Sequence, residues 1–124
     1  MPRTELILYK EEDGTIPLVN WLKNLPAKPR DKCVFRIERL REHGHELRRP
    51  EADYLRDGVY ELRARFGTVN FRILYFFYGT MAVVLSHGIT KEGRVSPGDI
   101  DKAAERKSKF LGNPQLHAFP WENV

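Results

Sequence analysis

Residues 59–88 constrain the fold most, because their side chains alternate with the period of two that defines a β-strand. Residues 59–65 place polar side chains on one face and apolar side chains on the other. Residues 69–78 carry aromatic and β-branched side chains on both faces, as a central strand does. A turn beginning at Gly79 then leads into a third strand at residues 81–86. The stretch therefore predicts three consecutive antiparallel strands in a curled sheet.

Three arginines stand out in these strands. Arg63 and Arg65 lie on the polar face of the first strand, and Arg72 interrupts the apolar middle strand. Burying a guanidinium without a partner is costly, so we expect Arg72 to open onto a concave site. Glu61 is the only acid within the three strands, and we expect it to be the ion-pair partner of these arginines.

The rest of the chain predicts a small α+β domain. Residues 4–9 resemble a first strand, and apolar stripes at helical spacing predict helices at residues 17–25, 29–43 and 97–111. Residues 45–57 show no period and are expected to form a surface connection into the sheet. We therefore expect one sheet, with the two early helices packed against it.

We expect a single domain over residues 1–111, because 124 residues suit one hydrophobic core. Residues 112–124 form a C-terminal tail that contains Phe119 and Trp121. This tail is expected either to be disordered or to dock as a short apolar peptide on its own domain or on a partner.

Composition narrows the function classes only in part. A formal charge of +4 suits an anionic partner but is common in other proteins too. The lone Cys33 excludes a disulfide framework. No apolar run approaches the ~20 residues that span a bilayer, and no export signal opens the chain, so we expect a cytoplasmic protein that contacts no membrane.

Familiar catalytic motifs are missing from the sequence. The chain has no glycine-rich phosphate loop and no Gly-x-Ser-x-Gly turn. His43 and His45 are expected to be a surface pair rather than metal ligands, because further ligands at suitable spacing are missing. We therefore expect neither a metal nor another cofactor.

The remaining candidate chemistry is phosphate chemistry by a cluster of cations. These are Arg63, Arg65, Arg72 and Lys91. RNA is cut without a metal when its 2′-hydroxyl attacks the adjacent phosphorus in line and cations stabilise the developing charge. By residue type, His87, a lysine of lowered pKa or Tyr75 could transfer the protons. A structural hydrogen-bonded role is at least as good an interpretation of His87, and Tyr75 suits the core better.

Four further arginines are candidates for contacts with a nucleic-acid backbone: Arg36, Arg48, Arg49 and Arg94. Arg48 and Arg49 lie in the irregular connection, where they can form the rim of a site. For Arg36, a solvated mixed-charge helix face is the plainer interpretation, because acids are interleaved with bases along that helix.

Linked motifs across the chain resemble a known family. They are Tyr60-Glu-Leu-Arg63-x-Arg65-Phe-Gly, Phe71-Arg72-Ile-Leu-Tyr75-Phe-Phe, Leu85-x-His87-Gly-x-x-Lys91 and Ser96-Pro97-x-x-Ile100-x-x-Ala103. Residues 4–111 resemble the phage-derived Gp49-like group, which belongs with HigB-type toxins in the RelE/ParE superfamily. The resemblance implies the element order β-α-α-β-β-β-α. It also implies a toxin that cleaves mRNA in the ribosomal A site and is silenced by a helix-turn-helix antitoxin.

The resemblance implies phosphate-binding and transition-state roles for Arg63, Arg65 and Arg72, with Lys91 as a further cation. Where members of the group often carry two lysines, this chain has Lys91 followed by an acid. Two alternatives stay open. A sister branch of the same fold poisons DNA gyrase, and an inactive domain would only bind an antitoxin or nucleic acid.

Overall fold

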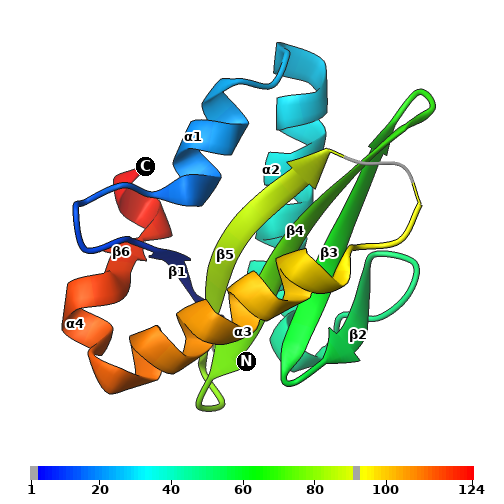
Figure 1. Ribbon diagram of the computed structural model, residues 1–124. Coiled ribbons are helices and arrows are strands. Elements are labelled where there is room, and N and C mark those ends of the chain that lie inside the picture. Colours follow the sequence, from blue (N-terminus) through cyan, green and yellow to red (C-terminus); the bar gives the residue numbers. More distant parts are fainter. Residues whose placement is uncertain (1–2, 91–92) are drawn as a thin grey trace.

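The computed structural model describes residues 3–90 and 93–124. Six strands in this part of the chain form one sheet in the order β2-β3-β4-β5-β1-β6 (Figure 1). The strands are β1 (Glu5–Tyr9), β2 (Ala52–Arg56), β3 (Val59–Phe66), β4 (Val69–Tyr78), β5 (Ala82–Thr90) and β6 (Ala118–Pro120). The α-helices are α1 (Pro17–Lys23), α2 (Ala27–His43), α3 (Pro97–Gly112) and α4 (Pro114–His117), with 3-10 turns η1 (Gly44–Glu46) and η2 (Trp121–Asn123). None of these helices is long and apolar enough to cross a membrane.

The sheet confirms the mixed α+β class and is mostly antiparallel, but one pairing differs from the expectation. β1 pairs with β5 in parallel, from Glu5 opposite Ala82 to Leu8 opposite Leu85. A parallel pair needs a long crossover, and the chain supplies one through α1, α2 and the strands β2 to β4. Local alternation carries no information on the direction of a distant partner, so the sequence could not reveal this pairing.

The irregular connection expected at residues 45–57 contains a strand. β2 pairs antiparallel with β3, and its register shifts between Tyr54 and Arg56. It is a short edge strand with several partly exposed side chains, which is why its alternation is weak. The expectation of a purely irregular connection is therefore wrong.

The third predicted strand is also longer than expected. β5 continues to Thr90 rather than ending at Ser86. The pairing with β4 shifts there, since Leu74 faces His87 whereas Tyr75 faces Leu85. This irregularity leaves Ser86 between the two registers and breaks the alternation, so the sequence beyond it resembled a loop.

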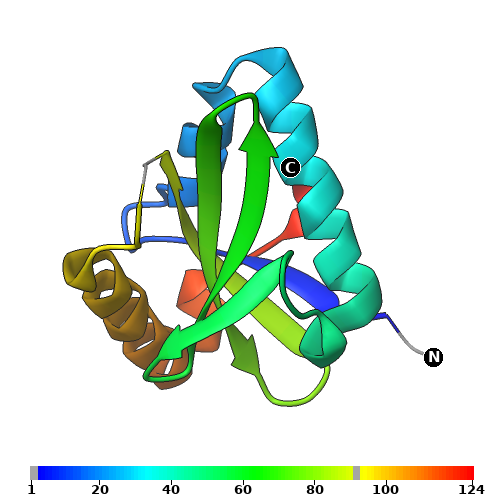
Figure 2. The same cartoon turned by 90° about the vertical axis from the view of Figure 1, so that its right-hand side faces the viewer.

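Helices cover the sheet on both faces. Figure 2 shows α2 on one side of the sheet and α3 on the other. The core on the first side joins α1 and α2 to the sheet through residues such as Leu18, Ile37 and Leu62. The opposite core contains Ile100 and Ala103 of α3 packed against Val59 and Leu74 of the sheet. The two early helices pack as expected, and α3 covers part of the second face.

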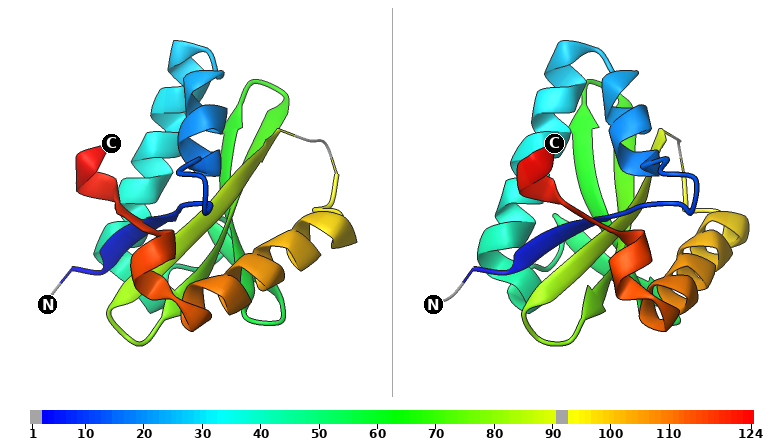
Figure 3. Two further views of the ribbon diagram at one scale, coloured as in Figure 1. Left: turned by 60° about the vertical axis from the view of Figure 1, so that its left-hand side comes forward. Right: turned by 90° about the vertical axis from the view of Figure 1, so that its left-hand side faces the viewer.

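The structure places the expected C-terminal tail on the domain. β6 pairs antiparallel with β1 at the edge of the sheet, and Figure 3 shows the end of the chain between β1 and α2. The Trp121 indole Nε1 donates to Glu38 Oε2 at 2.8 Å. Arg41 Nη1 lies 2.6 Å from Glu122 Oε1. Apolar packing and polar contacts thus fasten the segment to α2.

Candidate nucleic-acid interface

Arg63 and Arg72 are direct neighbours across the sheet. Arg63 on β3 faces Arg72 on β4, and the next same-face pair in this ladder is Arg65 opposite Asn70. Arg63, Arg65 and Arg72 lie on the face of the sheet that also carries Leu74, which packs against α3. Because the side chains of a strand alternate, this register fixes all three arginines on one face. The prediction that the strands bring them together is confirmed.

Glu61 bridges the two facing arginines. Its Oε1 accepts from Arg63 Nε at 2.8 Å and from Arg72 Nε at 3.0 Å. The Glu61 side chain is 5% exposed, compared with 15% for Arg72 and 36% for Arg63. Arg72 Nη1 also donates to the carbonyl oxygen of Gly93. A buried carboxylate therefore holds two adjacent guanidinium groups, as the sequence predicted.

The ion pairs continue to the edge strand through Asp53. Asp53 Oδ2 lies 3.2 Å from Arg63 Nη2 and 2.8 Å from Arg49 Nη2. The hydrogen bond from Arg49 is the largest cause that lowers the pKa of Asp53. We call this row, Arg49-Asp53-Arg63-Glu61-Arg72, the arginine row. Among these five side chains, the three cations outnumber the two carboxylates.

Arg65 extends the arginine row toward the tip of the β3–β4 hairpin. Its side chain is exposed, and its Nε donates to the carbonyl oxygen of Gly67 at 3.1 Å. Within the described residues it has no ion pair with a carboxylate. Arg65 is therefore the strand arginine whose charge is least neutralised, and it offers donors to an anion in solvent.

His87 lies on the same sheet face but is buried beneath α3. Its Nδ1 is 2.8 Å from Ser86 Oγ, and its Nε2 is 3.3 Å from Asp99 Oδ1. Burial is the main cause that lowers the pKa of His87, and the positive charge of Arg106 adds to it. Both ring nitrogens have partners within the domain, so His87 joins the start of α3 to β5. Tyr75 is also buried, and burial raises its pKa.

The other predicted contacts are distributed around the domain. Arg36 Nη1 lies 2.9 Å from Glu51 Oε2, and Arg39 also binds this carboxylate. The Arg39 hydrogen bond is the main cause that lowers the pKa of Glu51 to about 2. Arg94 is exposed between β5 and α3. Lys91 lies outside the described residues.

The histidine pair at the end of α2 is exposed, as expected. The ring of His45 stacks on Phe77 with the centroids 3.6 Å apart, and His43 Nε2 lies 2.9 Å from Arg39 Nη1. In residues 3–90 and 93–124, no group of three or more His, Cys, Asp or Glu side chains is arranged to hold a metal ion.

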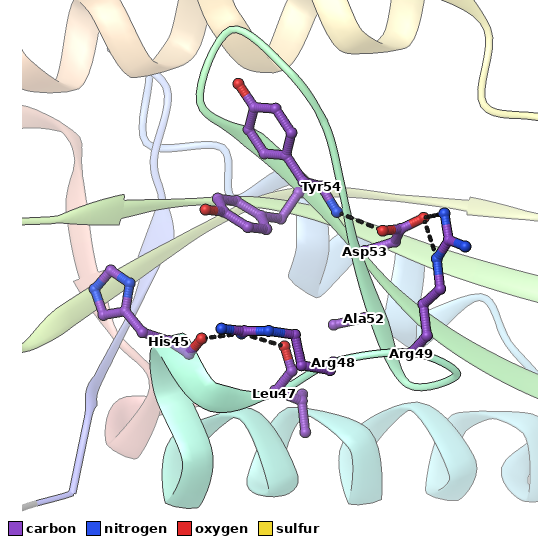
Figure 4. A pocket seen from close by; sticks show the side chains of 8 residues that line it. His45, Leu47, Arg48, Arg49, Ala52, Asp53 and Tyr54 are labelled. Carbon is purple, nitrogen blue, oxygen red and sulfur yellow. Dashed lines mark hydrogen bonds and ion pairs between the residues drawn. The ribbon is translucent and has the colours of Figure 1, made fainter.

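A pocket of about 600 Å³ lies beside the arginine row, between the η1 region and strands β2 and β3 (Figure 4). Its lining residues are His45, Leu47, Arg48, Arg49, Ala52, Asp53, Tyr54 and Tyr60. Arg72, where we expected a concave site, does not line it. Sequence reasoning placed Arg48 and Arg49 at the rim of a site but missed the aromatic lining, because that lining depends on the unpredicted strand β2. The pairing of Tyr54 with Tyr60 across β2 and β3, which brings two aromatic rings to one face, is the signal that would have revealed this lining.

Comparisons with known proteins identify the family. The family model described as phage derived protein Gp49-like matches residues 20–108, which include α2, the β2–β5 strands and most of α3. No curated protein matches the chain. The matched region contains the whole arginine row. The chain therefore belongs to the Gp49-like family of phage-derived proteins, a family associated with toxin-antitoxin systems.

Proposed function

We propose that this protein is the toxin of a type II toxin-antitoxin system, a HigB-type member of the RelE/ParE superfamily. In this proposal it acts in the cytoplasm as an endoribonuclease that cleaves mRNA on the ribosome. The single observation that carries the proposal is the facing pair Arg63 and Arg72, held by the buried carboxylate of Glu61. Membership of a family associated with toxin-antitoxin systems supports it.

The arginine row supplies the electrostatic part of RNA cleavage. Guanidinium groups on paired strands present donors in fixed directions, which suits binding of a phosphate and stabilisation of its extra negative charge. We assign binding of the RNA backbone to Arg65 and the exposed part of Arg63. We assign stabilisation of the transition state to Arg72, the least exposed of the three. Lys91 is proposed as a further cation.

The proton transfers need a different group from His87. A general base must reach the proton that it removes, whereas His87 is buried beneath α3 with both ring nitrogens engaged. Burial lowers the pKa of His87 from its ordinary value, but its place in the fold keeps it from the substrate. We therefore assign to His87 a role in positioning α3.

The proposed partner is a helix-turn-helix antitoxin. A surplus of positive charge along the arginine row favours an inhibitor that brings carboxylates to this face. Charge complementarity of this kind weakens as salt rises, because the Debye length falls from about 10 Å at 0.1 M to about 3 Å at 1 M. The affinity of the complex is therefore expected to fall between ~50 mM and ~500 mM salt.

Expression without the antitoxin tests the proposed function. Induction should arrest growth and leave transcripts cut within translated regions, whereas Arg65→Ala should relieve both effects. Arg56→Ala is the matched control, because Arg56 lies on β2 and pairs with Asp57 and Asp101 away from the arginine row. Growth arrest with intact transcripts and DNA broken at gyrase sites would identify a gyrase poison instead. A folded protein with neither effect would leave only a binding role.

A further inference from the structure

The pocket beside the arginine row combines rings and cations. We name it the Tyr54 pocket and define it by five of its lining residues, which are His45, Arg48, Arg49, Tyr54 and Tyr60. Its volume of about 600 Å³ lies within the range of ligand sites in proteins. Figure 4 shows rings and guanidinium groups arranged around the same space.

Tyr54 is a large ring that the fold leaves in solvent. It is 52% exposed on the edge strand β2. Its hydroxyl accepts a hydrogen bond from the Gly58 amide at 3.1 Å, and its ring packs against Tyr60 in a T-shaped arrangement with the centroids 5.0 Å apart. Tyr60 in turn stacks on Tyr75 at 5.4 Å. The exposed ring is thus fixed in direction by its contact with Tyr60 and by its hydroxyl.

Two arginines, Arg48 and Arg49, line the Tyr54 pocket. Arg48 donates from Nη1 to the carbonyl oxygens of His45 and Leu47, as Figure 4 shows. Carbonyl groups hold a guanidinium in place without cancelling its charge. Arg49 is 75% exposed at its side chain and pairs with Asp53. The pocket therefore offers a fixed cation and a second cation at its rim.

The Tyr54 pocket and the arginine row share two side chains, Arg49 and Asp53. Asp53 lines the pocket and binds both Arg49 and Arg63. A strand of RNA whose phosphates follow the row from Arg72 through Arg63 would therefore reach the edge of the sheet at Arg49. The pocket lies around that edge, because Tyr54 and Tyr60 alternate with Asp53 and Glu61 and therefore face the side of the sheet that α1 and α2 cover.

We propose that the Tyr54 pocket binds one unstacked base of single-stranded RNA. The base stacks on the Tyr54 ring, and Arg48 and Arg49 contact the adjacent phosphates. Proteins that hold single strands combine cations along the backbone with aromatic rings that stack on bases. The inference rests on the proposed function, because it assigns this pocket as a subsite for the RNA that the arginine row holds.

RNA binding by tyrosine variants tests the proposal. The probe is a single-stranded RNA hexanucleotide with one 2-aminopurine, whose fluorescence falls when the base stacks. Because stacking contributes substantially to binding, Tyr54→Ala should weaken the affinity by roughly 5- to 100-fold and remove the fluorescence change. Tyr54→Phe keeps the ring and loses only the hydroxyl, so it should bind within about twofold of the wild type. Phe35→Ala is the matched control, because Phe35 is 59% exposed on α2 outside the pocket.

Three results would overturn the proposal. The first is wild-type affinity for Tyr54→Ala in a folded protein. The second is equal losses for Tyr54→Ala and Phe35→Ala. The third is unchanged RNA binding by Tyr54→Ala with weakened antitoxin binding, which would make the pocket a protein-docking site.

Cleavage of ribosome-bound mRNA by the same preparations separates the two proposals. If the wild type cleaves ribosome-bound mRNA, and Tyr54→Ala cleaves it and binds the hexanucleotide equally well, the base site is refuted and the nuclease proposal stands. A wild type that binds the hexanucleotide through Tyr54 but cuts no mRNA refutes the nuclease and keeps the site.

Discussion

Glu61→Gln is the substitution that most sharply tests the arginine row. Glutamine keeps the size of the side chain and an oxygen acceptor but removes the charge from a carboxylate that is 5% exposed. Two bonds are affected, from Arg63 at 2.8 Å and from Arg72 at 3.0 Å. A hydrogen bond between charged partners contributes about 1 kcal/mol more than one to a neutral acceptor. Glu61→Gln should therefore lower the free energy of unfolding by about 2 kcal/mol.

The same substitution should strengthen RNA binding. With Glu61 neutral, one more positive charge of the arginine row is available to phosphate, and the side chains of Arg63 and Arg72 repel each other. The dependence of log K on log salt should steepen by about 0.7 for single-stranded RNA. A less stable protein that binds RNA more tightly is a combination that a purely structural role for Glu61 does not predict.

Thermal unfolding and fluorescence anisotropy measure the two effects. A loss of about 2 kcal/mol corresponds to a decrease in Tm of roughly 8 °C for a domain of this size. Glu105→Gln is the matched control, because it makes the same change in net charge at a side chain that is 68% exposed on α3. The reasoning is refuted if Glu61→Gln has the same Tm as the wild type, or if Glu61→Gln and Glu105→Gln gain equally in RNA affinity.

Three further predictions concern the fold around the site. The pKa of His87 is lowered from its ordinary value of 6.5, mainly by burial. The unfolded chain therefore takes up a proton more readily as the pH falls below that value, and the free energy of unfolding should fall there. Urea unfolding from pH 8 to pH 5 should show a shallower decline for His87→Gln than for the wild type. A Cβ at Gly88 would clash with the Trp21 ring, so Gly88→Ala should lower the free energy of unfolding by about 1–3 kcal/mol in denaturant unfolding; an equal cost in a Trp21→Leu background would exclude this clash as the cause. Trp121→Ala removes a partly buried ring and its hydrogen bond to Glu38, so it should cost about 1–3 kcal/mol, whereas Leu116→Ala, at a side chain that is 41% exposed, should leave Tm nearly unchanged.

Local alternation was enough to predict the central part of the candidate site. The period of two in residues 59–78 gave both long strands and placed Arg63 beside Arg72, because antiparallel neighbours share a face. The isolated acid Glu61 among arginines indicated their ion pair for a simple reason. A buried charge in a strand requires a partner, and no other acid lies within the three predicted strands.

Long-range pairing set the limit of the sequence analysis. The parallel β1–β5 pair and the docking of β6 on β1 join segments that are distant in the chain, and nothing local records their partners. The register shift beside Ser86 hid residues 87–90 of β5 and concealed that His87 lies under α3. The Tyr54 pocket was missed for a local reason, because an edge strand with half-exposed side chains has little apolar contrast.

Mapping of mRNA ends in a purified translation reaction tests the central proposal most directly. With wild-type protein, new 5′ ends should appear within the codon at the ribosomal A site, and naked mRNA should stay intact. Arg72→Ala, shown to be folded by circular dichroism, should reduce this cleavage by about 100-fold or more, as loss of an oxyanion donor does. Intact ribosome-bound mRNA with folded wild-type protein, or full cleavage by Arg72→Ala, would contradict the assignment of the arginine row as the nuclease site.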